Sequence, residues 1–232
     1  MPSGRRTRTG VLHCWWECHD YRLRNTALIN SETLTLLDNL AHRFREACEG
    51  IRFAAAASPE EIEAIYRLRY RTVIENGWAK PEDYPDGMEQ DEYDDHAIHI
   101  GGWQEEQLAA TMRLILPSQD RLLPTEAAFG LRIEPIGQVA DCSRGIVAPE
   151  FRNRGRQLFF GTLAQVWLEM RSHGYYELCG TLTGWMIRYY QRSGFSPVQL
   201  GPPQMYWGEL RFPAKFDLIK TAYQFLRQGR TD

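Results

Sequence analysis

From residue 51 onward, apolar positions along the chain alternate between strand-like and helical spacing. Ser58-Pro59-Glu60-Glu61 forms a capping box with proline at the first helical position, so we expect a helix from here to about Asn76. The predicted strands are 51–57, 96–104, 107–116, 137–148 and 175–182. Further helices are predicted at 156–173 and 184–192, and a segment at 198–210 leads to a last helix at 216–227. This order favours an α/β sandwich around one mixed sheet.

The first 50 residues follow a different pattern. Leucines at 34, 37 and 40 recur at helical spacing, which predicts one helix over residues 32–49. Asn30 and Ser31 can cap this helix, and Gly50 can end it. We therefore expect residues 1–50 to form an N-terminal extension with one helix, and residues 51–232 to form one α/β domain.

Composition excludes several classes of protein. The mean hydropathy is -0.47 and no apolar run approaches the roughly 18 residues of a membrane span. A net charge of -3 argues against a general nucleic-acid binder. The apolar stretch from Val11 to Trp16 is short and contains His13, whereas a signal peptide needs a longer apolar core. We therefore expect the protein to be cytoplasmic, with its five cysteines reduced.

One cluster near the N-terminus could in principle ligate zinc. His13, Cys14, Cys18 and His19 lie together in HCWWECHD. Their spacing matches no standard zinc finger, and no second Cys/His cluster follows. A solvated or locally packed segment is the better interpretation, and we predict no metal site.

Charged residues also fall where the pattern predicts a core. Arg69 lies seven residues after Ile62 and four before Val73, on the apolar face of the first predicted helix of the domain. A guanidinium there needs an anionic partner, unless the side chain snorkels from the edge of that face. The next loop offers such partners beside Trp78, although a run of acids is often only a solvated surface. These acids are Glu89, Asp91, Glu92, Asp94 and Asp95.

Two later segments carry candidate site residues. Arg113 lies among apolar neighbours on a predicted strand, where a carboxylate partner in a site suits it better than solvent. Asp141 and Arg144 follow on the next strand. A basic loop then leads into a helix, whose N-terminal N–H groups attract phosphate. Merely solvated arginines are the alternative for this loop, which contains Arg152, Arg154, Gly155 and Arg156.

Four short segments, in this order, resemble the acyl-homoserine-lactone (autoinducer) synthases and the long-chain N-acyl amino acid synthases of the GNAT superfamily. They are LRYRTVIENGW, MEQDEYD, TMRLILP and DCSR. VAPEFRNRGRQ is similar to the superfamily's acyl-CoA-binding motif, and YYQRSGF to its late helix–turn–strand motif. The resemblance covers about residues 51–218. Asp141 stands where the autoinducer synthases usually have Glu, and YDDHAIHI and LGPPQMYWGELRFP look closer to the N-acyl amino acid synthases.

The resemblance implies a GNAT-like three-layer sandwich around a mixed, splayed β-sheet. It also implies an enzyme that moves a fatty acyl group from acyl-carrier protein (ACP) or acyl-CoA to an α-amine, without a tightly bound cofactor. The acceptor would be S-adenosylmethionine or an amino acid, giving an N-acyl-homoserine-lactone or N-acyl amino acid, as in autoinducer synthesis for quorum sensing. A catalytically silent acyl or acyl-carrier binding module on the same fold is the alternative, which the replacement at Asp141 keeps open.

The resemblance also assigns roles to the candidate residues. Asp141 is expected to be the base that deprotonates the amine, directly or through water, with Arg144 and Arg113 organising the carboxylates around it. The expected acceptor site contains Arg69, Trp78, Asp91, Asp94 and Arg113. The expected donor site contains Gly145, Val147, Arg152, Arg154, Gly155 and Arg156.

Strand geometry makes a further demand on this assignment. Residues three apart on a regular strand point to opposite faces, so Asp141 and Arg144 could not serve one site. We therefore predict a β-bulge or strand splay between Asp141 and Val147, with the acyl chain in the resulting gap. We also predict that the charged ends of Arg69, Asp91, Asp94 and Arg113 converge in one cleft. An unbroken strand ladder would favour the silent binding module.

Overall fold

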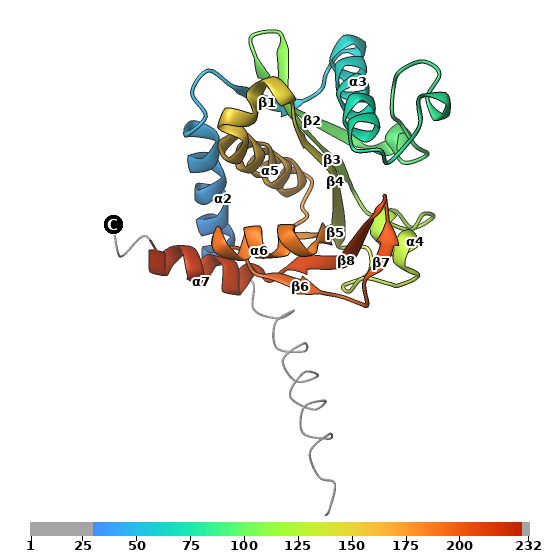
Figure 1. Cartoon of the computed structure of the whole chain (residues 1–232). Helices are drawn as coiled ribbons and strands as arrows, with labels where there is room; N and C mark the ends of the chain where they lie inside the picture. The colour runs from blue at the N-terminus through green and yellow to red at the C-terminus, as the bar shows by residue number, and fades with distance from the viewer. Residues whose placement is uncertain (1–29, 229–232) are drawn as a thin grey trace, which may run out of the picture.

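A computed structural model of the chain describes residues 30–228. The elements, coloured along the chain in Figure 1, are α2 (Ser31–Glu46), β1 (Arg52–Ala55), α3 (Pro59–Glu75), η1 (Pro81–Asp83), η2 (Asp94–His96), β2 (Ile98–Gln104), β3 (Gln107–Ile115), α4 (Pro124–Phe129), β4 (Val139–Val147), η3 (Pro149–Arg154), α5 (Gly155–Ser172), β5 (Glu177–Thr183), α6 (Gly184–Arg192), β6 (Pro197–Gln199), β7 (Gln204–Tyr206), β8 (Glu209–Phe216) and α7 (Leu218–Gln228). The possible zinc ligands His13, Cys14, Cys18 and His19 lie outside the described residues. None of the described helices is both long and apolar enough to cross a membrane.

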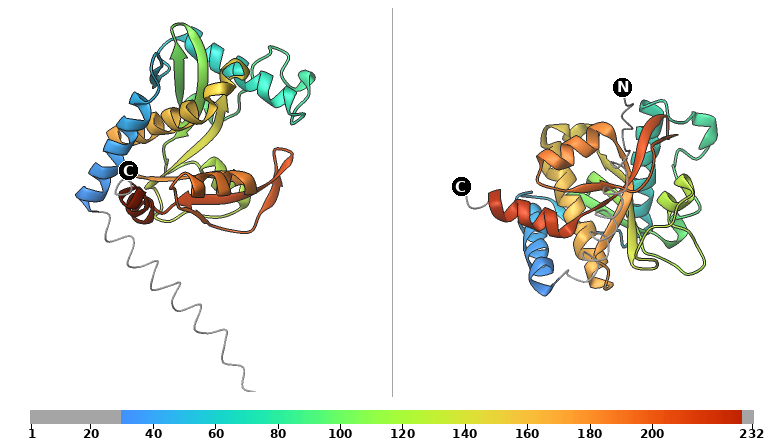
Figure 2. Two further views of the ribbon diagram at one scale, coloured as in Figure 1. Left: turned by 60° about the vertical axis from the view of Figure 1, so that its left-hand side comes forward. Right: turned by 90° about the horizontal axis from the view of Figure 1, so that it is seen from below.

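The strands form one mixed sheet in the order β1-β2-β3-β4-β5-β8-β6, with β7 paired to β8. Of these pairs, β4 and β5 run parallel and the others run antiparallel. Met112 and Leu114 of β3 pack with α5 in the main core, whereas Arg113 between them points to the α3 side. Helices α5 and α3 therefore cover opposite faces, and α2 packs outside α5 (Figures 1 and 2). This arrangement is the expected three-layer sandwich.

The predicted irregularity in β4 is confirmed. Arg113 pairs with Ser143, but Thr111, two residues earlier on β3, pairs with Ile146, three residues further on β4. One extra residue therefore bulges from β4 at this point, and Arg144 there adopts a left-handed backbone with φ 56°. Non-glycine residues rarely adopt this conformation, so the surrounding contacts must hold it.

The sheet also opens at the same strand. Parallel pairing of β4 with β5 covers only residues 139–141 and ends where Asp141 meets Cys179. Beyond this point the two strands diverge. At its start the contact is close, because a Cβ added to Gly180 would lie 2.6 Å from the carbonyl oxygen of Cys142. Glycine at 180 therefore allows the two strands to meet before they splay.

Most predicted elements lie within two or three residues of their observed bounds, but the segment 117–136, predicted as a loop, contains α4. This helix begins at Pro124, and the Glu126 carboxylate accepts hydrogen bonds from the N–H groups of Leu123 (3.1 Å) and Ile133 (2.8 Å). Six residues span less than two helical turns, too short for a periodic pattern to be recognised. The helix matters because it places Thr125 against Asp141.

Candidate active site

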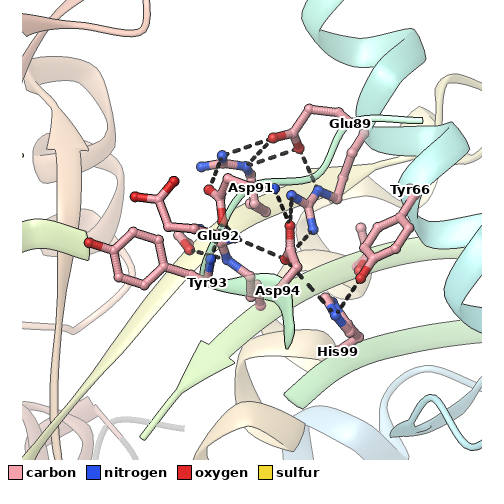
Figure 3. Close-up of polar contacts among 12 residues, drawn as sticks. Tyr66, Glu89, Asp91, Glu92, Tyr93, Asp94 and His99 are labelled. Atoms are coloured by element: carbon pink, nitrogen blue, oxygen red, sulfur yellow. Dashed lines mark hydrogen bonds and ion pairs between the residues drawn. The ribbon is translucent and has the colours of Figure 1, made fainter. Parts of the chain in front are cut away.

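A buried cluster of alternating charges lies between α3 and the sheet (Figure 3). Arg69 of α3 is 1 % exposed, and its Nη1 and Nη2 donate to both oxygens of Asp94 at 2.8 and 2.9 Å. Its Nε donates to Glu89 at 2.5 Å. Burial of an arginine on the core face of α3 is thus compensated by two carboxylates from the loop that follows the helix. The alternative of a snorkelling Arg69 is excluded.

Two further arginines complete this charge network. Arg113 of β3, also 1 % exposed, donates through Nη1 to Asp91 at 2.6 Å and to Asp94 at 2.9 Å. Arg144, turned by the bulge in β4, donates to Glu89 at 2.9 Å and to Asp91 at 2.8 Å. Three guanidinium groups therefore alternate with three carboxylates. The charged ends of Arg69, Asp91, Asp94 and Arg113 therefore lie together, as predicted.

The arginines of the network favour the ionised form of Glu89 and Asp94. Burial opposes ionisation of Asp94 and Glu89, but the neighbouring guanidinium groups outweigh it and hold the pKa of both carboxyl groups below their ordinary values. His99 lies at the edge of the cluster, hydrogen-bonded to Tyr66 at 3.2 Å. Burial lowers the pKa of His99, although Asp94 acts in the opposite direction. Glu89 and Asp94 are therefore poorly suited to accept a proton from a substrate, because the arginines make both carboxyl groups more acidic than usual.

Asp141 has a different environment. It is 1 % exposed, and its Oδ2 accepts from the N–H of Thr125 at 2.9 Å and lies 3.6 Å from Cys179 Sγ. Its Oδ1 has no hydrogen-bond partner among the described residues. Burial raises the pKa of this carboxyl, and the hydrogen bonds from Thr125 and the charge of Arg113 only partly offset that rise. Asp141 therefore combines a free oxygen with a basicity above that of an ordinary aspartate.

A cavity of about 350 Å³ occupies the gap between the splayed strands. Asp141, Arg144, Gly145 and Val147 all line it, so the bulge brings Asp141 and Arg144 to one site as predicted. Many of its other walls are apolar side chains, including Met112, Phe159, Leu163, Leu178, Leu182, Met186 and Phe216. A volume in this range and an apolar lining with a few polar groups suit a small organic ligand or a lipid chain.

Aromatic and cationic side chains line another part of the same cavity. Trp78 follows α3, and the guanidinium carbon of Arg211 lies 5.2 Å from the centre of its ring. Trp207, at the turn between β7 and β8, lies 4.5 Å from the guanidinium carbon of Arg144 in the same way. Burial lowers the pKa of Arg211, and its neighbour Glu209 does not fully compensate. Arg211 is thus a partly desolvated cation that faces the cavity.

The basic loop that was predicted to bind the donor lies outside the lining of the cavity. Arg152 of η3 and Arg156 in the first turn of α5 are exposed, and Arg154 donates to the carbonyl of Glu49 at 2.9 Å. Arg152 also lies 3.6 Å from Glu75. Of the predicted donor residues, Gly145 and Val147 line the cavity, whereas Arg152, Arg154, Gly155 and Arg156 do not. A donor role for this loop stays a prediction.

Sequence reasoning missed two groups. Glu89 was recognised only as one of a run of acids, yet it is fully buried and joins Arg69 to Arg144. The signal for its burial is tertiary, because its N–H donates to the carbonyl of Tyr66 and so ties the loop to α3. Arg211 was also missed. In the sequence, Trp207 and Arg211 lie on either side of Gly208. An aromatic and a basic side chain that flank a glycine turn are the signal that could have found them.

Within residues 30–228, no three His, Cys, Asp or Glu side chains are grouped so as to hold a metal ion. The cluster of carboxylates is instead neutralised by arginines, as described above.

Several solved structures of other proteins share this architecture. Similar solved structures include TofI in a ternary complex with an inhibitor and MTA (TM-score 0.60, 21% identity, 75% of this chain and 95% of that one). The CoA-dependent acyl-homoserine lactone synthase BjaI with SAM and isopentyl-CoA is also similar (TM-score 0.59, 23% identity, 77% and 89%). FeeM, an N-acyl amino acid synthase from uncultured soil microbes, aligns with TM-score 0.57 and 15% identity over 75% of this chain and 94% of that one. These likenesses confirm the GNAT-like fold.

The sequence itself identifies the family. The sequence model of the N-acyl amino acid synthase FeeM matches residues 64–214, well over half of the chain. A comparison with curated proteins finds no match. The matched segment runs from α3 to β8 and contains Arg69, Arg113, Asp141, Arg144 and Arg211. The chain therefore belongs to the FeeM family of N-acyl amino acid synthases and is an N-acyltransferase.

Proposed function

We propose that this protein transfers a fatty acyl group from the thioester of acyl-CoA or acyl-ACP to the α-amine of a free amino acid, giving an N-acyl amino acid. The observation that carries the proposal is the cavity between β4 and β5. It joins an apolar compartment, suited to an acyl chain, to a buried carboxylate with a free oxygen and raised pKa. S-adenosylmethionine, whose α-amine and carboxylate have the same arrangement, is the second acceptor to test.

Asp141 acts as the base in this proposal. An α-amino group has a pKa of about 8, so it is mostly protonated at neutral pH and cannot attack a carbonyl. Asp141 Oδ1 takes the proton, directly or through water, and the amine nitrogen then forms a bond to the thioester carbon. Collapse of the tetrahedral intermediate breaks the carbon–sulfur bond. The thiolate that leaves takes up the second proton, which the nitrogen loses as the amide forms, and Asp141 returns its proton to solvent.

The splayed edge of β4 stabilises the oxyanion of that intermediate. Beyond Asp141, β4 no longer pairs with β5, so this edge has no strand partner among the described residues. The N–H groups of the segment 145–147 are our candidates for the oxyanion donors, because they lie on the lining of the cavity. Gly145 has no side chain and therefore lets the thioester approach the backbone.

Arg211 binds the carboxylate of the acceptor. Arg69, Arg113 and Arg144 are already neutralised by carboxylates of the charge network. Among the described residues Arg211 forms an ion pair with Glu209 alone, at 2.8 Å, and its Nε donates to the carbonyl of Tyr206 at 3.1 Å. Burial still lowers the pKa of Arg211. A substrate carboxylate would compensate this desolvated cation. The rigid network would then serve to hold Arg144 and the wall of the cavity in place.

The assay is release of thiol from an acyl thioester, with the product identified by mass spectrometry. Arg211→Gln should raise the KM for the amino acid by about 10- to 100-fold, the equivalent of one lost hydrogen bond to a charged group. It should also remove the preference for an amino acid over its amide, which lacks the carboxylate. Arg132→Gln, at a side chain that is 63% exposed, is the matched control and should change neither.

The same assay separates the enzyme from the silent binding module. A binding module would bind acyl thioesters without any thiol release that depends on the amine. If Arg211→Gln left both the KM and the preference over the amide unchanged, the assignment of Arg211 would be wrong. If no amine supported thiol release in the unaltered protein, the proposed function itself would be wrong.

A further inference from the structure

A second, smaller cavity lies behind the apolar end of the first. It has a volume of about 60 Å³ and lies between α2 and the inner face of α5. Leu37, Leu40, Ala41 and Phe44 of α2 form one wall. Apart from Thr221 at its edge, its lining is apolar or aromatic. Water in this apolar pocket would find almost no hydrogen-bond partners, which favours an apolar occupant.

The two cavities share a wall. Leu163, Leu178 and Phe216 line both of them. Each of these side chains is apolar, and two of them are leucines whose rotamers can change without breaking a hydrogen bond. The apolar path that starts at Asp141 therefore ends at three side chains with empty apolar space behind them.

Helix α2 is held firmly over this space. Trp167 Nε1 of α5 donates to Asp38 of α2 at 2.7 Å, and Arg171 donates to the same carboxylate at 3.2 Å. Phe44 stacks on Phe160 with ring centres 5.4 Å apart. Yet α2 and α7, which packs beside it, both lie outside the segment 64–214 that defines the family match. The outer wall of the second cavity is thus a feature of this chain rather than of the matched segment.

We propose that the methyl end of a long acyl chain passes between Leu163, Leu178 and Phe216 into the cavity under α2, so that α2 sets the longest acyl group the enzyme accepts. The proposal rests on the proposed acyl transfer and adds which element of this chain limits the length of the acyl donor. An acyl chain is the occupant that fits, because the space lies directly behind the shared wall of the acyl site and is almost wholly apolar.

Burial of methylene groups gives the expected size of the effect. Each methylene removed from water contributes about fourfold in affinity. For the unaltered protein, kcat/KM should therefore rise with chain length along a series from octanoyl to octadecanoyl thioesters, until the second cavity is full. Filling that cavity should cost at least about tenfold in the ratio of long-chain to short-chain kcat/KM, the equivalent of roughly two excluded methylenes.

The test uses the full chain and three variants. Ala41→Leu, at a residue of α2 that is 4% exposed, fills the second cavity and should lower the ratio of octadecanoyl to octanoyl transfer about tenfold. Leu163→Ala removes part of the shared wall and should raise that ratio. Ala47→Leu makes the same substitution at the exposed C-cap of α2 and should leave the length profile as it is in the unaltered protein.

The length profiles of these variants decide whether the second cavity holds the acyl chain. If folded Ala41→Leu keeps the length profile of Ala47→Leu, the second cavity holds no acyl chain and the inference is overturned. Should Ala41→Leu fail to fold, Leu163→Ala decides alone, and an unchanged ratio overturns the inference. In both cases persistent amine-dependent transfer from octanoyl thioester leaves the proposed function intact, whereas loss of transfer from every donor to the unaltered protein would refute that function instead.

Discussion

Two arginines on helix α3, one buried and one exposed, each form a bidentate ion pair, and this pair allows a direct test of the charge network. Arg69 Nη1 and Nη2 contact Asp94 at 2.8 and 2.9 Å, with the side chain 1% exposed. Arg71 Nη1 and Nη2 contact Glu150 at 2.8 and 3.0 Å, with the side chain 42% exposed. Both pairs are bidentate and similar in distance. Arg69 differs from Arg71 in its burial and in its second carboxylate partner, Glu89.

Replacement of each arginine by methionine keeps the aliphatic bulk and removes the charge. In Arg69→Met, Glu89 and Asp94 lose a buried partner, which costs about 3–5 kcal/mol. For a chain of this size that corresponds to a fall in Tm of roughly 6–20 °C. Arg71→Met loses only a solvent-screened pair, worth about 0–1 kcal/mol, and its Tm should fall by no more than about 4 °C.

Thermal unfolding of the two variants beside the unaltered protein, followed by circular dichroism, measures this difference. The dependence of Tm on pH in the acidic range gives a second check. The lowered pKa values of Glu89 and Asp94 mean that their stabilisation is present above the ordinary carboxyl pKa of about 4 and is lost as the pH falls below it. The difference in Tm between Arg69→Met and the unaltered protein should therefore become smaller as the pH is lowered. Equal losses of Tm in Arg69→Met and Arg71→Met would refute the reasoning.

Two other predictions concern the catalytic strand. Asp141→Asn should lower kcat by about 10²–10⁴-fold at neutral pH while Tm stays unchanged or rises, because burial raises the pKa of Asp141 and makes its ionised form unfavourable. In the unaltered protein kcat/KM should rise with pH through that raised pKa as Asp141 loses its proton, and a pH profile that is the same in Asp141→Asn would exclude Asp141 as the base. Gly180→Ala places a Cβ 2.6 Å from the carbonyl oxygen of Cys142 and should destabilise the protein by about 1–3 kcal/mol. Gly184→Ala, whose Cβ would meet nothing closer than 3.6 Å, is its control, and equal Tm values for the two would contradict the close strand contact.

The parts of the site that could be predicted from sequence are those where a charge breaks a regular pattern. Arg69 and Arg113 stand on apolar faces, so each demanded a partner, and the structure supplies Asp91 and Asp94. The bulge followed from strand geometry combined with the assumption of a shared site for Asp141 and Arg144. The structural prediction was confirmed by the register of β3 and β4.

Other features depend on contacts that no local pattern carries. Periodicity cannot rank the acids of a loop, so the full burial of Glu89 could not be distinguished from the exposure of Glu92. The helix α4 has only six residues, and the second cavity arises from the packing of α2 against α5. The division of the chain at residue 50 and the donor role of Arg154 stay predictions.

The most direct test of the account is a single reaction with the purified full chain. Long-chain acyl-CoA or acyl-ACP is incubated with a mixture of free amino acids or with S-adenosylmethionine, and thiol release is followed while the products are identified by mass spectrometry. The account predicts thiol release that requires the amino acid, together with an equal amount of N-acyl amino acid. Thiol release that is independent of any amine, or no release although the acyl thioester binds, would contradict it.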